Sequence, residues 1–568
     1  MDRRFCFERN LLALSTHNPV LCSRLSGAET TLGRYRFPEA RSGDIVPALV
    51  DKSGAAHPLH SMVDPRREGE RLVSALKDEG FLVFLGLGGG YAAEAALARA
   101  GVSRALAIEY DINGLAELLS SREYINILGD SRFTLMADPA PEDIEALILE
   151  QYRPALEGGI KTFPLRARTE RDISHFNTAA EAVRQSIEKV SSDYSVQAHF
   201  GGRWFSNIIR NLKTAEAQNR SAPPIREAAI CAAGPSLDEQ LPLLAECRSS
   251  QSAKKNGPFI ISADTALPVL LKSGLSPDAV VSIDCQHISY YHFMGAFPGD
   301  IPLFLDIASP PLLADLSRSP FFFSGGHPLA AYISQKWRPL PRIDTSGGNV
   351  THACLSLAEN LGAERITVYG TDFAYPGGRV YARGTYIYPF FERKQTRLSP
   401  LEARFSAFLY RVPFLPPEAG QTGYYETAAF RFYRRAFEEK AAAMGAEIIP
   451  APGSGAPIRI ERQAAPGKRP RTLRLFASGA ALTGSAEFLA QYRKAIAALP
   501  LPGTKTGAYL EELDNDERQV LATLLPQTAA MKRRRPNLCT AELIAQVKAR
   551  SVESIDRVLT SIGEAPAR

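Results

Sequence analysis

Between Ile225 and Ile460, short apolar segments alternate with helical ones, and this alternation constrains the fold more than any other feature of the chain. The apolar segments that we interpret as strands are Glu227–Cys231, Phe259–Ser262, Ala279–Ile283, Pro302–Asp306, Phe321–Ser324, Ile366–Tyr369 and Ile448–Ile449. Such alternation is typical of an open, mostly parallel sheet with helices on its faces. The sequence therefore predicts an α/β fold for this region.

Residues that follow the strands are candidates for a site, because ligands of open α/β sheets bind beyond the carboxyl ends of the strands. The first strand leads into Gly234-Pro235-Ser236. The glycine allows a ligand close to the backbone, the proline suits the first turn of a helix, and the serine can cap that helix or bind phosphate. An ordinary strand-to-helix turn would also explain these three residues.

Other strand ends carry polar residues as well. Asp264 and Asp284 come directly after the second and third strands, and Asp372 follows Ile366–Tyr369. A further segment, Ser346-Gly347-Gly348-Asn349, opens a helix whose free amides could hold a phosphate. One acid at a strand tip is often only a helix cap. Because several strands of one sheet are followed by polar residues in this way, we predict a ligand site along the carboxyl edge of the sheet.

Taken together, these motifs resemble the bacterial sialyltransferases that use CMP-activated sugars. They resemble more closely the motility-associated factor (Maf) flagellin glycosyltransferases, a DUF115 or MptE-like family. The residues that carry the resemblance are Gly234-Pro235-Ser236-Leu237, the acids at 264 and 284, Gly347-Gly348-Asn349-Val350, Gly370-x-Asp372-Phe373 and Tyr381-Ala382. The likeness is close over about 225–460 and extends to the flanking regions in organisation only.

The resemblance implies a cytoplasmic transferase that moves a nonulosonic (sialic-acid-like) sugar from a CMP donor to Ser or Thr hydroxyls of flagellin. This modification would be needed for flagellar assembly and motility. The partners of the transferase would be flagellin and the nucleotide sugar, with no further cofactor and no metal. By the same resemblance, Tyr375 and Tyr381 would lie near the departing phosphate. Asp264 and Asp284 would contact ribose or cytosine, although the sialyltransferases have asparagine at both positions.

The general base is harder to place, because the histidine that the sialyltransferases carry after their tyrosine segment is missing. The equivalent stretch is Gly423-Tyr424-Tyr425-Glu426-Thr427. Glu426 could accept the proton of the acceptor hydroxyl, or it could simply be a solvated residue before a helix. His287 and His327 both follow strands and are rival candidates. Asp372 is predicted to be essential for catalysis, and the choice among the other three stays open.

The N-terminal region has a second glycine-rich turn. Gly86, Gly88 and Gly90 follow an apolar strand, and Glu109 ends the next strand, as in a Rossmann-like half-unit. The turn could hold S-adenosylmethionine, or it could belong to a scaffold that binds no cofactor. A methyltransferase that uses this turn is therefore one alternative function. A pterin pyrophosphokinase-like enzyme is a second, because archaeal enzymes of that kind share the Gly-Pro-Ser turn and the aspartate-tipped strands. A non-enzymatic flagellin-binding factor is a third, because the general base is not identified.

The length of 568 residues predicts about three domains. We expect a Rossmann-like domain with a helical connector at 1–220, a glycosyltransferase domain at 221–465, and a helical domain at 466–568 with helices at Ser485–Leu499, Ala508–Leu525 and Ala541–Ile562. Within the last domain, Asp514-Asn515-Asp516 is interpreted as surface charge, not as a metal motif.

The composition limits the class of protein. The net charge of +5 is too small to indicate a nucleic-acid partner by itself. No stretch reaches the roughly 18 apolar residues that span a bilayer. Seven cysteines without a CxxC pair fit reduced thiols in the cytoplasm. The oligomeric state is left open.

Overall fold

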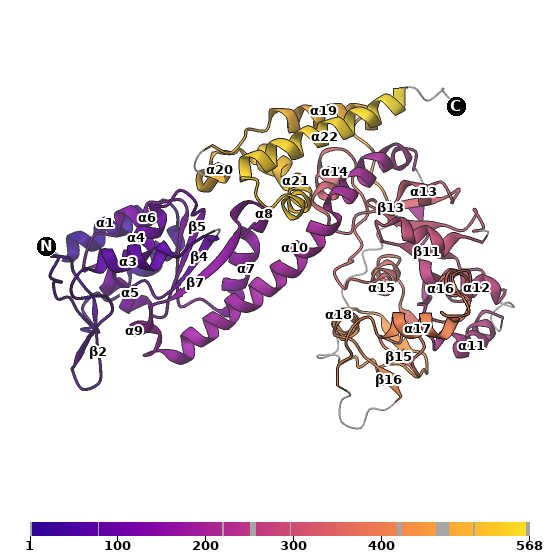
Figure 1. The fold of residues 1–568 in the computed structure, drawn as a ribbon, viewed down its shortest axis with the longest axis horizontal. Helices are drawn as coiled ribbons and strands as arrows, with labels where there is room; N and C mark the ends of the chain where they lie inside the picture. Colours follow the sequence, from indigo (N-terminus) through magenta and orange to yellow (C-terminus); the bar gives the residue numbers. More distant parts are fainter. Residues whose placement is uncertain are drawn as a thin grey trace. The chain divides into compact units, whose positions relative to one another are not determined.

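The structure, a computed structural model, describes residues 3–77, 79–218, 221–249, 257–295, 297–416, 423–461, 476–503 and 506–563. The chain forms two compact units. The N-terminal unit comprises Met1–Gly201 with Ala495–Arg550, and the central unit comprises Gly202–Lys494 with Ser551–Arg568. Figure 1 follows the chain through both. The expected C-terminal domain begins outside the described residues, and its helices belong in part to each unit.

The N-terminal unit is built on a four-stranded parallel sheet with the order β6-β5-β4-β7. These strands are β4 (Glu79–Leu85), β5 (Arg104–Glu109), β6 (Phe133–Ala137) and β7 (Gly159–Pro164). Side chains alternate across the sheet, so that Leu82 and Phe84 belong to one apolar core and Phe81, Val83 and Leu85 to the other. This arrangement confirms the predicted Rossmann-like region.

Helices and a small sheet cover this unit. The helices before α10 are α1 (Arg3–Ser15), α2 (Pro19–Ser26), α3 (Pro65–Ser74), α4 (Tyr91–Leu97), α5 (Ile112–Leu119), α6 (Ile125–Leu128), α7 (Pro141–Gln151), α8 (Pro154–Glu157) and α9 (Arg166–Thr169). The small antiparallel sheet consists of β1 (Tyr35–Arg36), β2 (Ala48–Val50) and β3 (Ala56–Pro58).

One helix of 44 residues, α10 (Ile173–Glu216), contributes to both units. Its first half places Phe176, Ala179 and Val183 in a core of the N-terminal unit. In its second half Ile208 and Leu212 are fully buried within the central unit. The boundary predicted at residue 220 therefore follows a helix that the division into compact units crosses near Gly201.

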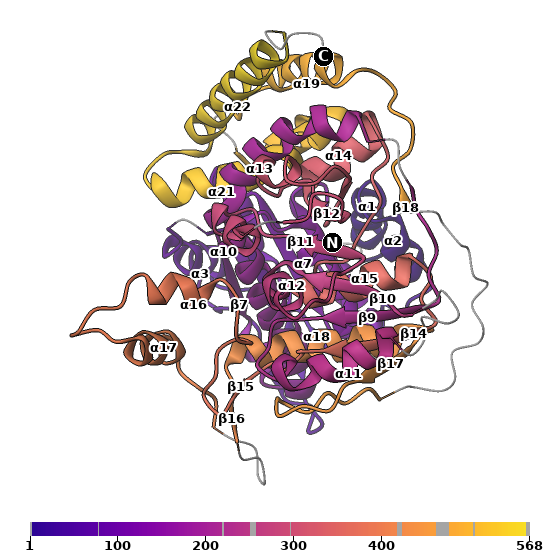
Figure 2. The ribbon, with the colours of Figure 1, turned by 90° about the vertical axis from the view of Figure 1, so that its right-hand side faces the viewer.

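The central unit contains a seven-stranded sheet of order β13-β12-β11-β10-β9-β14-β17, in which every pair is parallel. The strands are β9 (Glu227–Cys231), β10 (Phe259–Ala263), β11 (Ala279–Ser282), β12 (Leu303–Asp306), β13 (Pro320–Phe323), β14 (Arg365–Tyr369) and β17 (Glu447–Pro450). In Figure 2 the strands from β12 to β17 lie one below another in this order. The predicted parallel α/β fold is confirmed, each strand lying within a residue or two of its expected place.

The strand order reverses at β9, which pairs with β10 on one side and with β14 on the other. Successive strands from β9 to β13 extend the sheet in one direction, and β14 then returns to the opposite side of β9. The connections after β9 and β14 therefore diverge at the carboxyl edge. Such a switch point is where open α/β sheets bind ligands.

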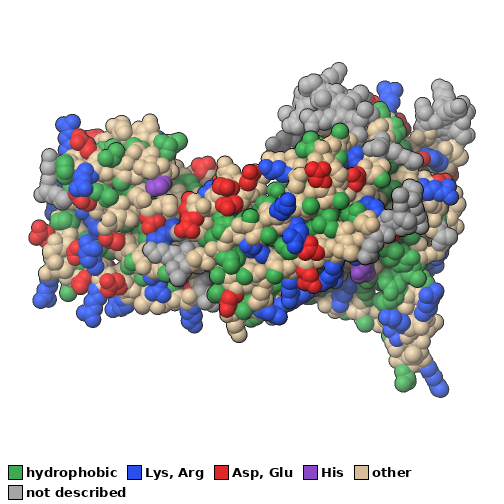
Figure 3. Space-filling view, turned by 90° about the horizontal axis from the view of Figure 1, so that it is seen from above, with side chains coloured by type: hydrophobic (Ala, Val, Ile, Leu, Met, Phe, Trp, Pro, Cys, Tyr) green, Lys and Arg blue, Asp and Glu red, His purple; other side chains and the backbone are tan. Residues whose placement is uncertain are grey.

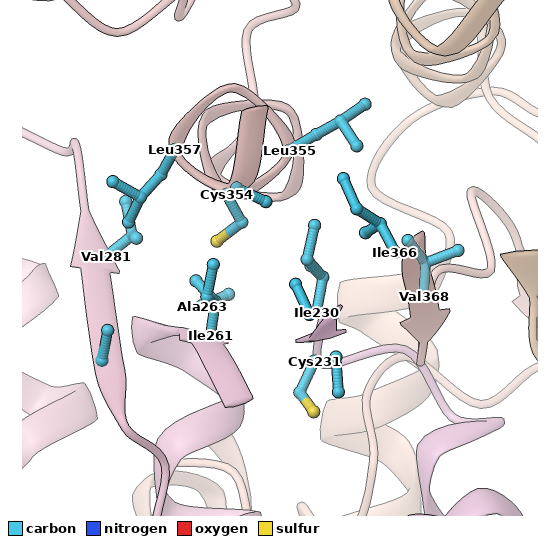
Figure 4. Packing of buried hydrophobic residues seen from close by; sticks show 14 of the residues in the cluster. Ile230, Cys231, Ile261, Ala263, Val281, Cys354, Leu355, Leu357, Ile366 and Val368 are labelled. Carbon is cyan, nitrogen blue, oxygen red and sulfur yellow. The ribbon is translucent and has the colours of Figure 1, made fainter. Parts of the chain in front are cut away.

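Helix α15 (Val350–Asn360) packs on one face of the sheet and makes much of its core. Cys354 points toward Ala263 and Ile261 of β10, and Leu357 points toward Val281 of β11 (Figure 4). Each large aliphatic side chain buried in this way contributes about 1.5–3 kcal/mol relative to its exposed state. The central strands are buried on both faces, which explains why they appear in the sequence as continuous apolar runs.

The remaining elements surround the sheet or continue beyond it. Before α15 they are β8 (Ser221–Ala222), α11 (Leu237–Ser249), η2 (Asp264–Ala266), α12 (Leu267–Lys272), η3 (His287–Phe293), α13 (Pro311–Ala314) and α14 (Pro328–Lys336). After it come β15 (Tyr375–Pro376), α16 (Ile387–Glu392), α17 (Leu401–Leu409), β16 (Tyr424–Tyr425), α18 (Ala428–Ala443) and β18 (Phe476–Ala477). Figure 2 shows α16, α17, β15 and β16 to one side of the sheet.

The C-terminal helices are α19 (Ser485–Ala498), α20 (Thr506–Glu512), α21 (Asn515–Arg534) and α22 (Thr540–Gly563). The helix expected at Ala508–Leu525 is divided because Asp514 caps α21: its side chain accepts from the Glu517 backbone, and Glu517 accepts from the Asp514 backbone. Asp514 is thus a helix cap. None of the described helices is both long and apolar enough to cross a membrane. Acidic and basic side chains are interspersed on the face seen in Figure 3.

Candidate active site at the carboxyl edge of the central sheet

The turn after β9 is held in shape by Asp372 from the loop after β14. Asp372 Oδ2 accepts a hydrogen bond from the Ser236 backbone N–H at 2.8 Å, and the Gly234 N–H donates to the Gly370 carbonyl at 2.8 Å. A Cβ on Gly234 would lie 2.4 Å from Asp372 Oδ2 and 2.5 Å from the Gly370 oxygen, so only glycine fits. The two connections that diverge at the switch point are therefore locked together.

Ser236 is fully buried, and its hydroxyl is held from the opposite side by the segment that follows β17. The Ser454 backbone N–H donates to Ser236 Oγ at 3.0 Å, and the two serine hydroxyls lie 3.4 Å apart. Gln240 of α11 donates to the Pro452 carbonyl and accepts from the Gly370 N–H. Pro235 is buried within the same turn. Ser454 could not be identified from the sequence, because its role depends on a contact with a residue 218 positions away.

Asp372 is 5% exposed, and burial raises the pKa of its carboxyl group. Its hydrogen bond to Ser236 opposes that shift. The carboxylate therefore already accepts a hydrogen bond from the backbone of the protein. This geometry favours a positioning role for Asp372 over the direct catalytic role that was predicted.

Asp264 and Asp284 lie next to each other at the ends of β10 and β11. Asp264 is 2% exposed and accepts from the Ser282 hydroxyl at 2.7 Å and from the Thr265 N–H at 2.7 Å. Asp284 accepts from the Gln286 N–H at 2.9 Å. Burial raises the pKa of Asp284, and the neighbouring Asp264 carboxylate raises it further. The structure brings these two predicted residues together as a pair of carboxylates.

The second predicted loop, Ser346–Asn349, is shaped by local contacts. Asn349 caps α15 by accepting from the His352 N–H at 3.0 Å, and it donates to the Gly347 carbonyl at 2.9 Å. A Cβ on Gly347 would lie 2.2 Å from His352 Nδ1, and Gly348 has a φ of 70°. Asn349 therefore uses its side chain to start the helix. Among the described residues no contact joins this loop to Gly234–Ser236.

Asp344 organises this loop and was missed by the sequence reasoning. Its Oδ1 accepts from the Ser346 N–H at 3.0 Å and from the Ser346 hydroxyl at 2.6 Å, and Oδ2 lies 3.2 Å from His352 Nε2. Partial burial raises the pKa of Asp344, but the hydrogen bonds from Ser346 and His352 outweigh it and lower the pKa to about 2. The exposed Ser346 backbone and hydroxyl are thus already partly engaged.

Tyrosines and one arginine gather beside the two aspartates. Burial raises the pKa of Tyr375 and of Tyr381, whereas Arg411 opposes the shift at both and hydrogen-bonds to Tyr375. The carboxylate of Asp264 contributes to the shift at Tyr381, and Asp264 and Asp284 both contribute at Tyr386. These groups therefore share one electrostatic neighbourhood. Tyr386 and Arg411 were missed because neither directly follows one of the predicted strands.

A cavity of about 380 Å³ opens next to this cluster. It is lined by α12, by the end of η3 and by α16, with an apolar wall that includes Leu271, Phe293 and Phe390. Lys272, Arg393 and Lys394 are its charged lining residues, and no acidic residue lines it. Tyr386 and His292 also line it, which connects the cavity to the aspartate and tyrosine cluster.

Two asparagines of α10 hold the loops that carry the strand-end acids. Asn207 Nδ2 donates to the carbonyls of Cys285 and Ala308, at 3.1 and 2.8 Å. One turn later, Asn211 Nδ2 donates to Ile307 and Ser309, both at 2.8 Å. Both side chains are buried. Residues four apart share a helix face, so an Asn-x-x-x-Asn pattern in an amphipathic helix was the signal available in the sequence.

Glu426 is 6% exposed and is bound by two arginines of α18. Its Oε2 accepts from Arg431 at 2.9 and 2.7 Å, and its Oε1 accepts from Arg434 at 3.0 Å. Both carboxylate oxygens of Glu426 therefore already accept hydrogen bonds from guanidinium groups of its own chain. This environment does not fit the predicted role of general base.

The two predicted histidines have different surroundings. His327 is half-buried at the start of α14, where Nδ1 accepts from the Leu329 N–H at 3.1 Å, and its ring packs against Trp204. Burial lowers the pKa of His327 to about 3. It follows β13, the edge strand farthest from the switch point on that side, so it does not fit the role of base either. His287 is exposed at the start of η3, three residues after Asp284.

Comparisons with known proteins agree with this architecture. Residues 203–378 match the family model described as 6-hydroxymethylpterin diphosphokinase MptE-like. The solved structure of a MAf glycosyltransferase from Magnetospirillum magneticum AMB-1 is similar with a TM-score of 0.58 and 15% identity, over 98% of this chain and 95% of that chain. The chain has the Maf fold with an MptE-like centre. The resemblance inferred from the motifs is thereby confirmed.

Relatives in sequence cover less of the chain. Two uncharacterized proteins of Treponema pallidum (strain Nichols) are 37% identical over 152 residues and 38% identical over 114 residues. These stretches are 26% and 20% of this chain and 54% and 51% of the relatives. The chain therefore spans about half the length of the curated relatives it matches.

In this Maf-like chain the space around the N-terminal glycine turn is occupied by other side chains of the protein. Glu109 is 1% exposed, accepts from the Leu87 N–H at 2.6 Å and lies 3.4 Å from the buried Arg168 guanidinium. A Cβ on Gly88 would lie 2.6 Å from His60 Nε2, and the Gly89 N–H donates to that nitrogen at 2.8 Å.

The other glycines of the turn are equally enclosed. A Cβ on Gly86 would lie 3.1 Å from Arg168, and one on Gly90 would lie 2.7 Å from Ile127. An acid that binds the ribose of S-adenosylmethionine must be reachable, and Glu109 is not. Of the two predictions for this turn, the geometry favours the scaffold that binds no cofactor.

Proposed function

We propose that the chain is a glycosyltransferase that moves a nonulosonic sugar from a CMP-activated donor to Ser or Thr hydroxyls of flagellin, in the cytoplasm and without a further cofactor. The observation that carries the proposal is the locked switch point. There the Gly234–Ser236 turn, the Asp264 and Asp284 pair and the tyrosine–arginine cluster stand at one sheet edge. The Maf fold supports the same reaction class.

The charge distribution of this edge suits a CMP donor. When the glycosidic bond breaks, the phosphate of the departing CMP gains negative charge, and donors directed at it lower the barrier. Tyr375, Tyr381 and Arg411 are the donors beside the cluster. Asp264 and Asp284 supply acceptors that ribose hydroxyls and the cytosine amino group can use. The nucleotide would lie over the carboxyl ends of β9, β10 and β11.

Donor turnover tests the proposal. Purified protein is incubated with CMP-N-acetylneuraminic acid and flagellin of the source organism, and CMP release and the intact mass of flagellin are measured. We expect CMP release with a matching gain of sugar mass, and both should fall at least about 100-fold in Asp284→Ala. Asp315→Ala, which removes an exposed acid of the same unit, is the matched control. CMP release that is equal in the two variants would contradict the assignment of the site.

The description of the family model favours one second candidate, a pterin diphosphokinase. In that reading the same edge would hold ATP and a hydroxymethylpterin, and AMP would be the product. Incubation with 6-hydroxymethylpterin and ATP separates the two functions. AMP formation would support the second candidate, and its absence alongside CMP release supports the transferase.

A further inference from the structure

His292 lines the cavity that adjoins the strand-end acids. It lies near the end of η3, which follows β11 and the Asp284 loop, and its ring lines the 380 Å³ cavity. The cavity adjoins the aspartate and tyrosine cluster through Tyr386. A group at this position faces the open space beside the nucleotide edge, which is the place from which an acceptor must approach.

The other described acid–base candidates of the central unit are engaged elsewhere. Glu426 is bound by two arginines, and the Nδ1 atom of the half-buried His327 caps helix α14. His352 is 2% exposed, lies 3.2 Å from Asp344 and is covered by Gly347. His287 is exposed and does not line the cavity. His292 is the histidine that lines it.

The surroundings of His292 fix the ring and leave one nitrogen for a ligand. The ring meets Tyr386 edge to face, with 4.7 Å between centroids. Nδ1 is buried without a hydrogen-bond partner, so Nε2 is the nitrogen that can meet a ligand. Burial raises the pKa of Asp284, and His292 is among the neighbouring groups that oppose this shift, so the two side chains belong to the same electrostatic neighbourhood. The cavity also presents the cations of Lys272, Arg393 and Lys394 to the ring.

We propose that His292 is the general base of the transfer, an assignment that rests on the proposed function. His292 Nε2 takes the proton of the acceptor hydroxyl while the hydroxyl oxygen forms its bond to the anomeric carbon. The bond from that carbon to the phosphate oxygen breaks, and its electron pair leaves with CMP. The imidazolium then releases its proton to water. Tyr386 positions the ring through its edge-to-face contact.

A change of acceptor tests this role, because a cysteine thiol is partly ionised near neutral pH and needs little help from a base. The modified serine of flagellin is replaced by cysteine, and transfer from CMP-N-acetylneuraminic acid is measured with both acceptors. With the serine acceptor, His292→Ala and His292→Gln should lower kcat by about 100-fold or more. With the cysteine acceptor the loss should be less than about tenfold.

Three controls separate this role from folding and from the rival histidine. Calorimetry with CMP alone should give the same affinity for His292→Gln as for the unaltered chain, which reports an intact site without relying on activity. His17→Ala, an exposed histidine of the N-terminal unit, should transfer at the unaltered rate. His287→Ala tests the rival directly and should have the smaller effect.

Each contrary result has a distinct meaning. Equal losses with serine and cysteine acceptors, no loss in the His292 variants, or a larger loss in His287→Ala would each overturn the assignment of His292. If the unaltered chain transfers sugar to neither acceptor, the proposed function itself fails, and the assignment fails with it.

Discussion

Two substitutions of Asp372 can distinguish a positioning role of its carboxyl group from a direct role in catalysis. Its carboxylate accepts from the Ser236 N–H at 2.8 Å and is 5% exposed. Replacement by alanine removes the acceptor and leaves a buried N–H unsatisfied. Replacement by asparagine keeps an oxygen of the same reach, and because burial already raises the pKa of Asp372, a neutral group costs little there. The two substitutions should therefore differ.

The magnitude follows from that single hydrogen bond. A bond to a charged acceptor is worth about 1.5–3 kcal/mol, which corresponds to roughly 10- to 150-fold in donor affinity if the turn loses its shape. We expect Asp372→Ala to raise the KM for the CMP-sugar by that factor and Asp372→Asn to raise it by less than about fivefold. Steady-state kinetics with the donor varied at saturating flagellin provides the measurement. The positioning account is refuted if Asp372→Asn loses kcat as completely as Asp372→Ala while the donor KM stays unchanged.

Three further predictions concern groups away from the reacting atoms. Asn207→Leu should destabilise the loops after β11 and β12 by about 2–3 kcal/mol, because the Cys285 and Ala308 carbonyls lose their hydrogen-bond donor. Amide hydrogen exchange of residues 283–286 should therefore become faster, and an unchanged exchange rate would show that Asn207 does not hold these loops. Glu426→Gln should lower stability by about 3 kcal/mol or more in chemical denaturation while the transfer rate of the folded fraction is retained; a large loss of kcat at full stability would restore it as the base. Burial raises the pKa of Glu157 to about 7 from an ordinary 4.5. Ionisation of Glu157 therefore lowers the stability of the folded state as the pH rises from about 4.5 to about 7; the loss is complete at about pH 8 and absent at about pH 4. Glu157→Gln should therefore protect the amides of the N-terminal unit at pH 8, by up to about 3 kcal/mol in hydrogen exchange, and leave them unchanged at pH 4.

Much of the central fold could be predicted because its strands are buried on both faces. β9, β10, β11 and β14 appear as unbroken apolar runs, and the residues directly after them are necessarily at one edge of a parallel sheet. Asp264 and Asp284 were found in this way. The chemical role of a strand-end residue does not follow from its place, however. Asp372 and Asn349 are at the predicted edge, yet both side chains accept hydrogen bonds from backbone N–H groups of the protein.

The rest depended on contacts between distant segments. Ser454 reaches Ser236 across 218 residues, and Asn207 reaches Ala308 across 101. Tyr386 and His292 enter the electrostatic neighbourhood of Asp264 and Asp284 only after the chain has folded, and Arg411 enters that of Tyr386. Proximity along the chain pointed to His287, whereas the cavity is lined by the histidine five residues later. The contacts that enclose the N-terminal glycine turn were hidden for the same reason, since His60 and Arg168 come from outside the motif.

Intact-mass spectrometry of flagellin tests the central claim most directly. Flagellin is compared from the source organism, from a strain lacking this chain, and from that strain complemented with the unaltered chain or with His292→Ala. The account predicts a loss of mass equal to one or more nonulosonic acid residues without the chain, restored by the unaltered chain and not by His292→Ala. Flagellin of identical mass in all four samples would contradict it.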